Sequence, residues 1–149
     1  MPHDNSFRDY IVEDVLGHIP GITSRAMFGG WGIYLDKIVV GIIAEGELYL
    51  KADKELVSKY KKLDLYPFTY SGQKGKKYEM SYMSVPIETL EDREKMEERV
   101  YESYEISKRA KKWYNTNMKL RRSEIFAIVL ALATFLFGIL IYPYLPERI

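Results

Sequence analysis

The apolar residues of the first twenty positions recur with the spacing of a helix. In "SFRDYIVEDVLGHI", Phe7, Ile11 and Val15 come four residues apart. Because a helix completes one turn in about 3.6 residues, this spacing places the apolar side chains on one face. The pattern therefore predicts an amphipathic helix that ends near residues 17–20.

The next segments are rich in β-branched and aromatic residues, which favour strands. "MFGGWGIYLD", "KIVVGIIAEG" and "ELYLKAD" cover residues 27–53, and Asp36-Lys37 and Glu45-Gly46 separate them. Each separation is short enough for a hairpin turn. We therefore predict three sequential antiparallel strands.

Residues 53–114 continue the succession of helix and hairpin. "DKELVSKYKKL" begins with Asp53, a favourable N-cap residue, and predicts a second helix. "PFTYS" and "KKYEMSYMSVP" flank the turn "GQKG" and predict a second hairpin. The charged stretch from Pro86 to Tyr114 has no internal glycine or proline and predicts one long helix.

A change of composition near residue 119 sets the last part of the chain apart. From Ile125 to Tyr142, "IFAIVLALATFLFGILIY" carries no charged residue. As a helix it extends about 27 Å at about 1.5 Å per residue, close to the roughly 30 Å thickness of a hydrocarbon core. Because the segment is apolar all round, it predicts a transmembrane helix, and the central helix of a soluble oligomer is the alternative.

The charges around this segment predict its orientation. Lys119, Arg121 and Arg122 precede it, whereas one acid and one base follow it in "PYLPERI". This excess of cations predicts that the N-terminal part lies in the cytoplasm. We therefore expect a cytoplasmic domain at residues 1–118, and a basic flank with a tail anchor at residues 119–149 that crosses a lipid bilayer once. The predicted fold class is α+β, an antiparallel sheet of about five strands with flanking helices, plus one C-terminal transmembrane helix.

Composition argues against most catalytic chemistries. The chain of 149 residues has 22 Lys and Arg against 21 Asp and Glu, so its formal charge of +1 produces no strong overall attraction to nucleic acid. It contains no cysteine, which excludes disulfides and thiolate metal sites. The two histidines, His3 and His18, form no pattern with a nucleophile or a zinc ligand. We expect no enzymatic activity, no cofactor and no metal site.

The segment "RAMFGGWGIYLD" gathers three glycines around one tryptophan. A P-loop or a dinucleotide fingerprint requires a different glycine spacing at the start of a helix. Glycine within a strand marks a bulge or a place where another backbone comes close. Gly29, Gly30 and Gly32 are therefore interpreted as shaping the sheet, and ligand or partner binding is the alternative.

A small basic cluster occupies the second predicted hairpin. "YSGQKGKKYEMSY" combines Lys74, Lys76 and Lys77 with tyrosines on either side. Lysines contact phosphates and exposed aromatic rings stack on bases, which indicates a nucleic-acid contact. Three lysines beside a glycine-containing turn are more typical of a solvated hairpin tip, and tyrosines at alternate positions of a strand are more often part of a core.

Several short motifs resemble the N-terminal domain of the TfoX/Sxy family. They are an arginine, Met-Phe-Gly-Gly, Gly-Ile-Tyr, Leu-Tyr-Leu-Lys, Pro-Phe-x-Tyr and Met-Ser-Tyr, in this order. The resemblance implies a small α+β domain with an antiparallel sheet, no established catalytic activity, and a role in transcriptional regulation of bacterial competence genes that depends on partner proteins. The motif positions fall on Arg25, Met27, Phe28, Gly29, Gly30, Gly32, Tyr34, Tyr49, Lys51, Pro67, Phe68, Tyr70, Met80, Tyr82 and Pro86.

One departure from the family shapes the functional expectation. Longer members carry a second, helical domain, where this chain has the apolar segment. We expect a non-enzymatic, membrane-tethered regulatory or protein-interaction module with an unidentified protein partner. The candidate partner-binding residues are Arg25, Met27, Phe28, Gly29, Gly30, Trp31, Gly32 and Lys51. The alternative is a transcription-related, nucleic-acid-associated regulator that acts through Lys74, Lys76 and Lys77.

Overall fold

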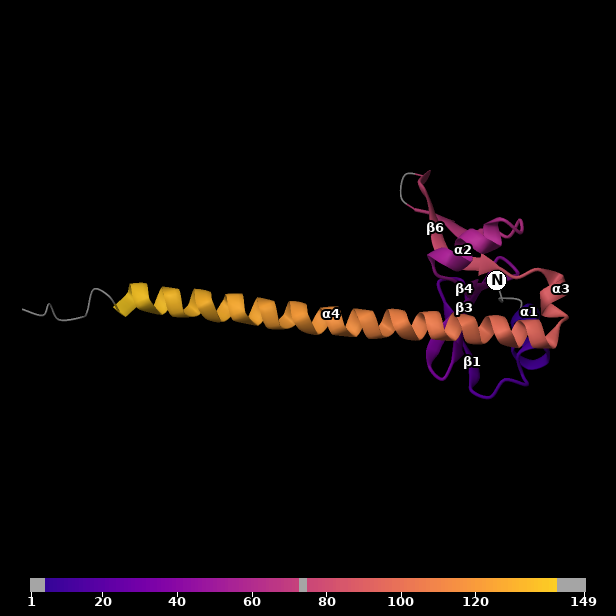
Figure 1. Cartoon of the computed structure of the whole chain (residues 1–149), viewed down its shortest axis with the longest axis horizontal. Helices are drawn as coiled ribbons and strands as arrows, with labels where there is room; N and C mark the ends of the chain where they lie inside the picture. The colour runs from indigo at the N-terminus through magenta and orange to yellow at the C-terminus, as the bar shows by residue number, and fades with distance from the viewer. Residues whose placement is uncertain (1–4, 73–74, 142–149) are drawn as a thin grey trace, which may run out of the picture. The chain divides into compact units, whose positions relative to one another are not determined.

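The computed structural model describes residues 5–72 and 75–141, and for residues 119–123 and 135–141 it describes the backbone alone. The chain divides into two units, Met1–Arg109 and Ala110–Ile149, and each is treated by itself below. The first unit holds the sheet and the short helices, and the second continues the last helix. Figure 1 shows both units.

The first unit is built on one antiparallel sheet of six strands, in the order β1-β2-β3-β4-β6-β5. The strands are β1 (Ile22–Met27), β2 (Gly30–Leu35), β3 (Ile38–Ala44), β4 (Glu47–Lys51), β5 (Pro67–Ser71) and β6 (Lys77–Ser84). The α+β class and the antiparallel pairing are confirmed, whereas the prediction of about five strands is one short. The strand missing from the prediction is β1, the edge strand that precedes the glycine segment.

Two-residue turns join the first four strands. The turn residues, all at positive φ, are Phe28-Gly29, Asp36-Lys37 and Glu45-Gly46. Positive φ at both central residues is the geometry of a type I′ turn, whose twist matches that of the strands it connects. The hairpin turns predicted at Asp36-Lys37 and Glu45-Gly46 are confirmed, and the third turn lies inside the glycine segment.

The first two predicted helices are present. Helix α1 (Ser6–Asp9) continues directly into the π-helical segment η1 (Tyr10–Val15). Helix α2 (Lys54–Lys61) begins where expected, because the Asp53 carboxylate accepts a hydrogen bond of 3.0 Å from the Leu56 backbone N–H. That contact satisfies one of the donors that the first turn of a helix leaves free.

The predicted long helix is two helices. Helix α3 (Ile87–Leu90) ends at Glu91, and α4 (Arg93–Ile141) begins after Asp92, whose carboxylate accepts a 3.1 Å hydrogen bond from the Lys95 backbone N–H. This N-cap starts a new helix and separates it from α3. Helix α4 also continues well beyond the predicted end at Tyr114.

The main core lies between one face of the sheet and the helices. Ile11 of η1, Ile33 of β2, Leu50 of β4 and Val100 of α4 all pack in one cluster and are fully or almost fully buried. A smaller cluster places α2 on the same face, where Tyr60 packs with Met83 of β6. The helices of the first unit therefore cover one face of the sheet.

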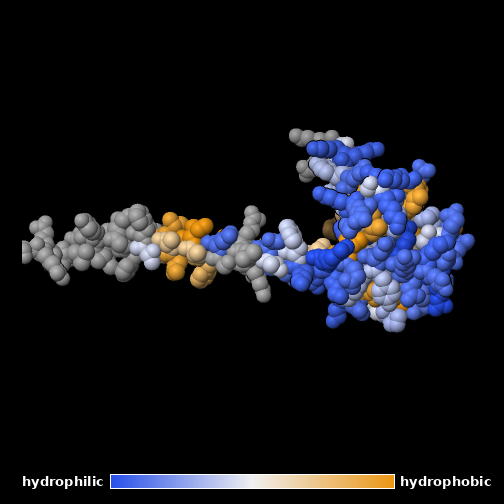
Figure 2. Space-filling view, viewed as in Figure 1, coloured by the Kyte–Doolittle hydropathy of each residue, from blue (hydrophilic) through white to orange (hydrophobic). Residues whose placement is uncertain are grey.

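The second unit is the continuation of α4, and its apolar side chains are exposed. Ile125, Phe126, Ile128, Val129, Leu130 and Leu132 are all more than half exposed. Figure 2 shows hydrophobic side chains gathered along this stretch of the helix.

A search of the described residues finds no helix with an apolar stretch sufficient to cross a membrane. The structure therefore does not support the transmembrane helix predicted at residues 125–142. Of that segment, the side chains of residues 135–141 and the whole of Tyr142 lie outside the described residues, as do the side chains of Lys119, Arg121 and Arg122.

Candidate functional site

The two faces of the sheet differ in what covers them. Paired residues of neighbouring strands share a face. One row of partners, on the face that the helices cover, runs Ser24, Ile33, Gly41, Leu50, Met83. The alternate row runs Arg25, Gly32, Ile42, Tyr49, Ser84. Among the described residues, the hydrophobic cluster on this second face is formed by strand residues alone. We call this face the open face.

The glycines of the β1–β2 hairpin make close approaches possible. A Cβ atom on Gly30 would lie 2.2 Å from the Ile43 carbonyl oxygen of β3, nearer than real Cβ contacts come. A Cβ atom on Gly32 would lie 2.6 Å from the Met27 sulfur and 2.9 Å from the Tyr34 ring. The close approach expected from glycines in a strand is therefore present at Gly30 and Gly32.

Gly29 is required for the backbone conformation of the turn and not for a close approach. It lies in the turn at φ +81°, and an added Cβ atom would meet no other atom within 4 Å. Its neighbour Phe28 also has positive φ, at 48°, and its side chain is 100% exposed. Positive φ is rare for a bulky residue, so the hairpin holds an aromatic ring in water at some conformational cost.

A groove of about 560 Å³ crosses the open face between two hairpins. Its lining includes Met27, Phe28 and Gly30 from the β1–β2 hairpin, Ile42 and Ala44 from β3, and Phe68, Tyr70 and Met80 from the β5–β6 hairpin. Ile42 is almost completely buried, whereas Tyr70 and Met80 are 47% and 38% exposed. The groove thus has a buried apolar floor and exposed apolar walls.

Lys51 is a half-buried cation on the open face. Its ammonium nitrogen lies 4.6 Å from the centroid of the Tyr82 ring, and burial lowers the pKa of the amine from its usual value. Tyr82 packs in one cluster with Ile42 and Phe68, which line the groove. Lys51 therefore belongs to the same surface as the groove.

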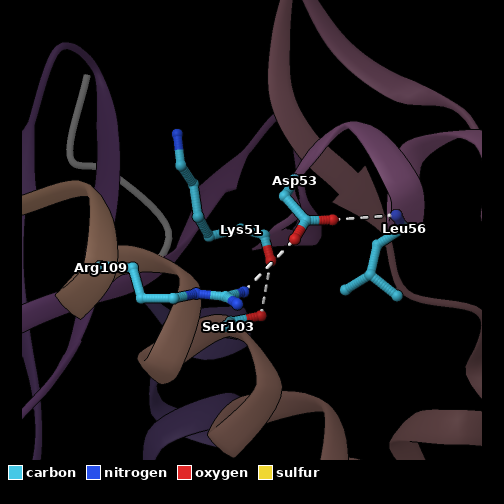
Figure 3. Close-up of polar contacts among 5 residues, drawn as sticks. All are labelled: Lys51, Asp53, Leu56, Ser103 and Arg109. Atoms are coloured by element: carbon cyan, nitrogen blue, oxygen red, sulfur yellow. Dashed lines mark hydrogen bonds and ion pairs between the residues drawn. The ribbon is translucent and has the colours of Figure 1, made fainter. Parts of the chain in front are cut away.

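The backbone of Lys51 is tied to α4, whereas its side chain is not. Ser103 donates a 2.8 Å hydrogen bond to the Lys51 carbonyl oxygen, and Arg109 lies 3.3 Å from the Asp53 carboxylate. Figure 3 shows the Lys51 side chain extending away from these contacts. Within the described part of the chain, no carboxylate forms an ion pair with the Lys51 amine.

Arg25 is the second cation of the open face. It is exposed, and its guanidinium carbon lies 6.0 Å from the centroid of the Tyr34 ring. Like Lys51, Arg25 forms no ion pair with any carboxylate of the residues that the structure describes. Tyr34 in turn lies 3.9 Å from the Met27 sulfur, which joins Arg25 to the first wall of the groove.

Glu47, an acidic residue of the open face, is hydrogen-bonded to two tyrosines. Its carboxylate accepts hydrogen bonds of 2.7 Å from the hydroxyls of Tyr49 and Tyr66. Burial, and then the hydrogen bond to Glu47, raise the pKa of Tyr49 well above its usual range. Both tyrosines therefore stay protonated as donors, and Glu47 is held at the β3–β4 end of the face.

The basic hairpin carries a stacked tyrosine pair. The rings of Tyr70 and Tyr78 lie 5.5 Å apart with 22° between their planes, and the Lys76 amine lies 5.6 Å from the Tyr78 centroid. Lys77 is exposed at the start of β6, and Lys74 lies outside the described residues. Tyr82, the last residue of the basic segment "YSGQKGKKYEMSY", is 7% exposed and packs with Ile42.

Trp31 differs from the other candidate residues in its position. It pairs with Ile43 in the sheet and packs against the main core, and the Arg8 guanidinium lies 4.4 Å from its ring. It also lines the groove.

Sequence reasoning missed part of the groove. Ile42 and Ala44 of β3 and the β5–β6 residues Phe68 and Met80 were not grouped with the glycine segment. The alternation along β3 is interrupted where the register with β2 shifts, so the face of each β3 residue is not apparent from a period of two.

The described residues contain no group of three or more histidine or acidic side chains placed to hold a metal ion. A family model described as the TfoX N-terminal domain matches residues 14–107. No curated protein matches the chain.

Proposed function

The chain belongs to the TfoX N-terminal domain family, which suggests a regulatory, competence-related role, and we propose that it acts as a non-enzymatic protein-interaction module. The open face of the sheet is the proposed binding surface. The observation that carries this proposal is the position of the residues behind the family resemblance. Most of them lie on the open face or at its hairpin tip: Arg25, Met27, Phe28, Gly30, Gly32, Tyr34, Tyr49, Lys51, Phe68, Tyr70, Met80 and Tyr82.

Packing alone explains only some of these residues. Tyr49 and Tyr82 are 5% and 7% exposed, so they contribute to a small core. Phe28 is fully exposed and Tyr70 is 47% exposed, so neither aromatic ring belongs to a buried core. Exposed aromatic residues beside an apolar groove are typical of surfaces that another protein covers.

The experiment removes one ring without disturbing the turn. Asparagine adopts positive φ readily and Asn-Gly is a favoured type I′ turn, so Phe28→Asn removes the aromatic anchor and keeps the hairpin. Crosslinking capture from cells compares the full-length wild type with Phe28→Asn and with Tyr101→Ala, an exposed tyrosine of α4. We expect Phe28→Asn alone to abolish specific capture. Equal capture by all three chains would refute the proposal.

We also propose that the apolar part of α4 anchors the module in a membrane, with the sheet domain in the cytoplasm. The support is the row of exposed apolar side chains from Ile125 to Leu132, together with the uncharged sequence that continues to Tyr142. Carbonate extraction of cell membranes tests the anchor. We expect the wild type to stay in the pellet and Leu130→Arg to be released in part, since a central arginine costs roughly 3 kcal/mol on insertion. Recovery of the wild type in the soluble fraction would contradict the anchor.

The orientation has its own test. Charge reversal at Lys119, Arg121 and Arg122 is expected to disturb the topology, because cations next to the apolar segment set it. Protease protection of the sheet domain in sealed vesicles reads the topology directly. An unchanged protection pattern would remove the argument for a cytoplasmic domain.

Nucleic-acid binding by the second hairpin is the alternative function. The stacked and partly exposed rings of Tyr70 and Tyr78, with Lys76 beside them, favour a contact with single-stranded nucleic acid. Fluorescence anisotropy with a labelled oligonucleotide tests it across salt concentrations. Binding that weakens with salt and is lost in a Lys76→Glu, Lys77→Glu double variant would favour the alternative over the protein partner.

A further inference from the structure

We propose that the groove of the open face binds an extended segment of a partner protein that carries apolar side chains and, two to four positions from one of them, a carboxylate that pairs with Lys51. This inference rests on the proposed function and names the chemistry of the partner. It follows from three features of the open face: apolar walls that no described residue covers, two cations without a carboxylate partner in that part of the chain, and an acid that already accepts hydrogen bonds.

The exposed walls of the groove favour a polypeptide as the ligand. Phe28, Tyr70 and Met80 are exposed, and they stand on opposite hairpins above the buried floor of Ile42. A small apolar molecule on the floor would leave these walls in water. A protein segment covers floor and walls together and excludes water from the contact, as interface cores do.

The charges of the face fix one further property of that segment. Lys51 and Arg25 have no carboxylate partner among the described residues, whereas Glu47 already accepts hydrogen bonds from Tyr49 and Tyr66. On β4, Lys51 therefore places a positive charge at one end of the strand, and Glu47, already hydrogen-bonded, lies at the other end, while Arg25 shares the row of Tyr49. An anionic side chain complements the Lys51 end, and a cationic one is repelled there.

The spacing between groove and cation predicts the pattern of the segment. Lys51 lies one row beyond Tyr49 on β4, and Tyr49 pairs with Ile42. Rows on one face of a strand are about 7 Å apart, so Lys51 is about 7 Å from the row of Ile42 and about 14 Å from the row of Ala44. An extended chain covers this distance in about two to four residues. The acid is therefore expected two to four positions from an apolar side chain that fills the groove.

The partial burial of the Lys51 ammonium group favours an ion pair with a carboxylate. It is half buried beside the Tyr82 ring, and burial lowers the pKa of the amine because the charged form is poorly solvated. A carboxylate at this site compensates for the lost solvation and gives a charge-assisted hydrogen bond. The cation is accordingly a specificity contact and adds little to the stability of the unbound domain.

The test is a selection of twelve-residue peptides from a random display library on the full-length chain, with Phe28→Asn as the counter-selection target. We expect enriched peptides to carry an Asp or Glu two to four positions from an apolar residue. Binding of a synthesised peptide is then measured by fluorescence anisotropy. Lys51→Met, which keeps the apolar stem, is expected to weaken binding at least tenfold. Lys62→Met, which removes an exposed lysine at the end of α2, is expected to change nothing.

The possible outcomes separate the two proposals. Peptides that bind through Phe28 without an acid, or with no effect of Lys51→Met, overturn this inference and leave the protein-interaction surface in place. Failure to enrich any peptide over Phe28→Asn overturns the binding surface itself. Dodecanoate is the control ligand, and binding of dodecanoate with the same dependence on Lys51, without peptide binding, would assign the groove to small amphiphilic acids and refute a protein segment.

Discussion

Replacement of Gly30 by alanine tests the close contact between β2 and β3. The new Cβ atom would lie 2.2 Å from the Ile43 carbonyl oxygen, where real Cβ contacts stay beyond 3.0 Å. The obstacle is backbone, which has no rotamer to change, so the two strands must separate by nearly an ångström. Overpacking of this kind costs about 1–3 kcal/mol, and a weakened ladder hydrogen bond adds about 1 kcal/mol. We therefore expect Gly30→Ala to lower the free energy of unfolding by about 3 kcal/mol.

Gly29→Ala is the matched control in the same hairpin. Its Cβ atom would meet nothing within 4 Å, so the cost comes from the positive φ of +81° alone. That cost is about 1–2 kcal/mol for an L residue. Urea unfolding of both purified full-length variants, followed by circular dichroism, measures the difference. Equal losses in the two variants, or a neutral Gly30→Ala, would show that the β2–β3 contact does not limit this position.

Further predictions concern single side chains and pH. Phe28→Asn is expected to raise the free energy of unfolding by about 1 kcal/mol, because it relieves the positive φ, and thermal unfolding measures this gain. Asp53→Ala is expected to cost about 1 kcal/mol in urea unfolding through loss of the α2 cap, and a neutral result would mean that solvent replaces the cap. Met96→Ala is expected to cost about 2–5 kcal/mol in the same assay, because this side chain is fully buried in the main core, and a loss below 1 kcal/mol would contradict that packing. The stability of the domain is expected to fall as the pH rises above about 10, because the unfolded chain then releases a Tyr49 proton that the folded chain keeps, and Tyr49→Phe is expected to make the decline shallower in thermal melts across pH.

The turns and most elements of the sheet could be predicted because their signals are local. Asp36-Lys37 and Glu45-Gly46 separate apolar runs at hairpin spacing, and Asp53 is a favourable cap before an amphipathic run. Strand β1 was missed because its sequence, "ITSRAM", is half polar and its burial alternates only weakly at the edge of the sheet. An edge strand packs on one neighbour, so its composition carries a weaker signal.

The long helix shows a limit of periodicity. The spacing of Leu90, Met96 and Val100 suits one continuous amphipathic helix, and no glycine or proline interrupts it. The structure instead ends α3 at Glu91 and starts α4 with the Asp92 carboxylate as a cap. Aspartate is also common on the exposed side of helices, so a single aspartate in the sequence does not predict that one helix ends and another begins there.

The candidate site was predictable in its parts and not in its assembly. The glycine segment, Lys51 and the tyrosines of β6 were identified from the sequence. Their common surface depends on β6 pairing with β4, which places Tyr82 beside Lys51 and brings Phe68 of the second hairpin into one cluster with Ile42 of β3. A pairing between strands that are far apart in the sequence leaves no mark in the local spacing of residues.

The succession of two-residue turns has a consequence for how the chain folds during synthesis. Strands β1 to β4 pair with one another in sequence order, so closing the loops between them costs little chain entropy and this meander has a low contact order. The second wall of the groove comes with β5 and β6, which reach β4 only after α2 has been made. We therefore expect the meander to form first on the ribosome and the groove to be completed last. A partner that needs both walls then discriminates finished chains from nascent ones, because the groove does not exist until Ser84 has left the exit tunnel.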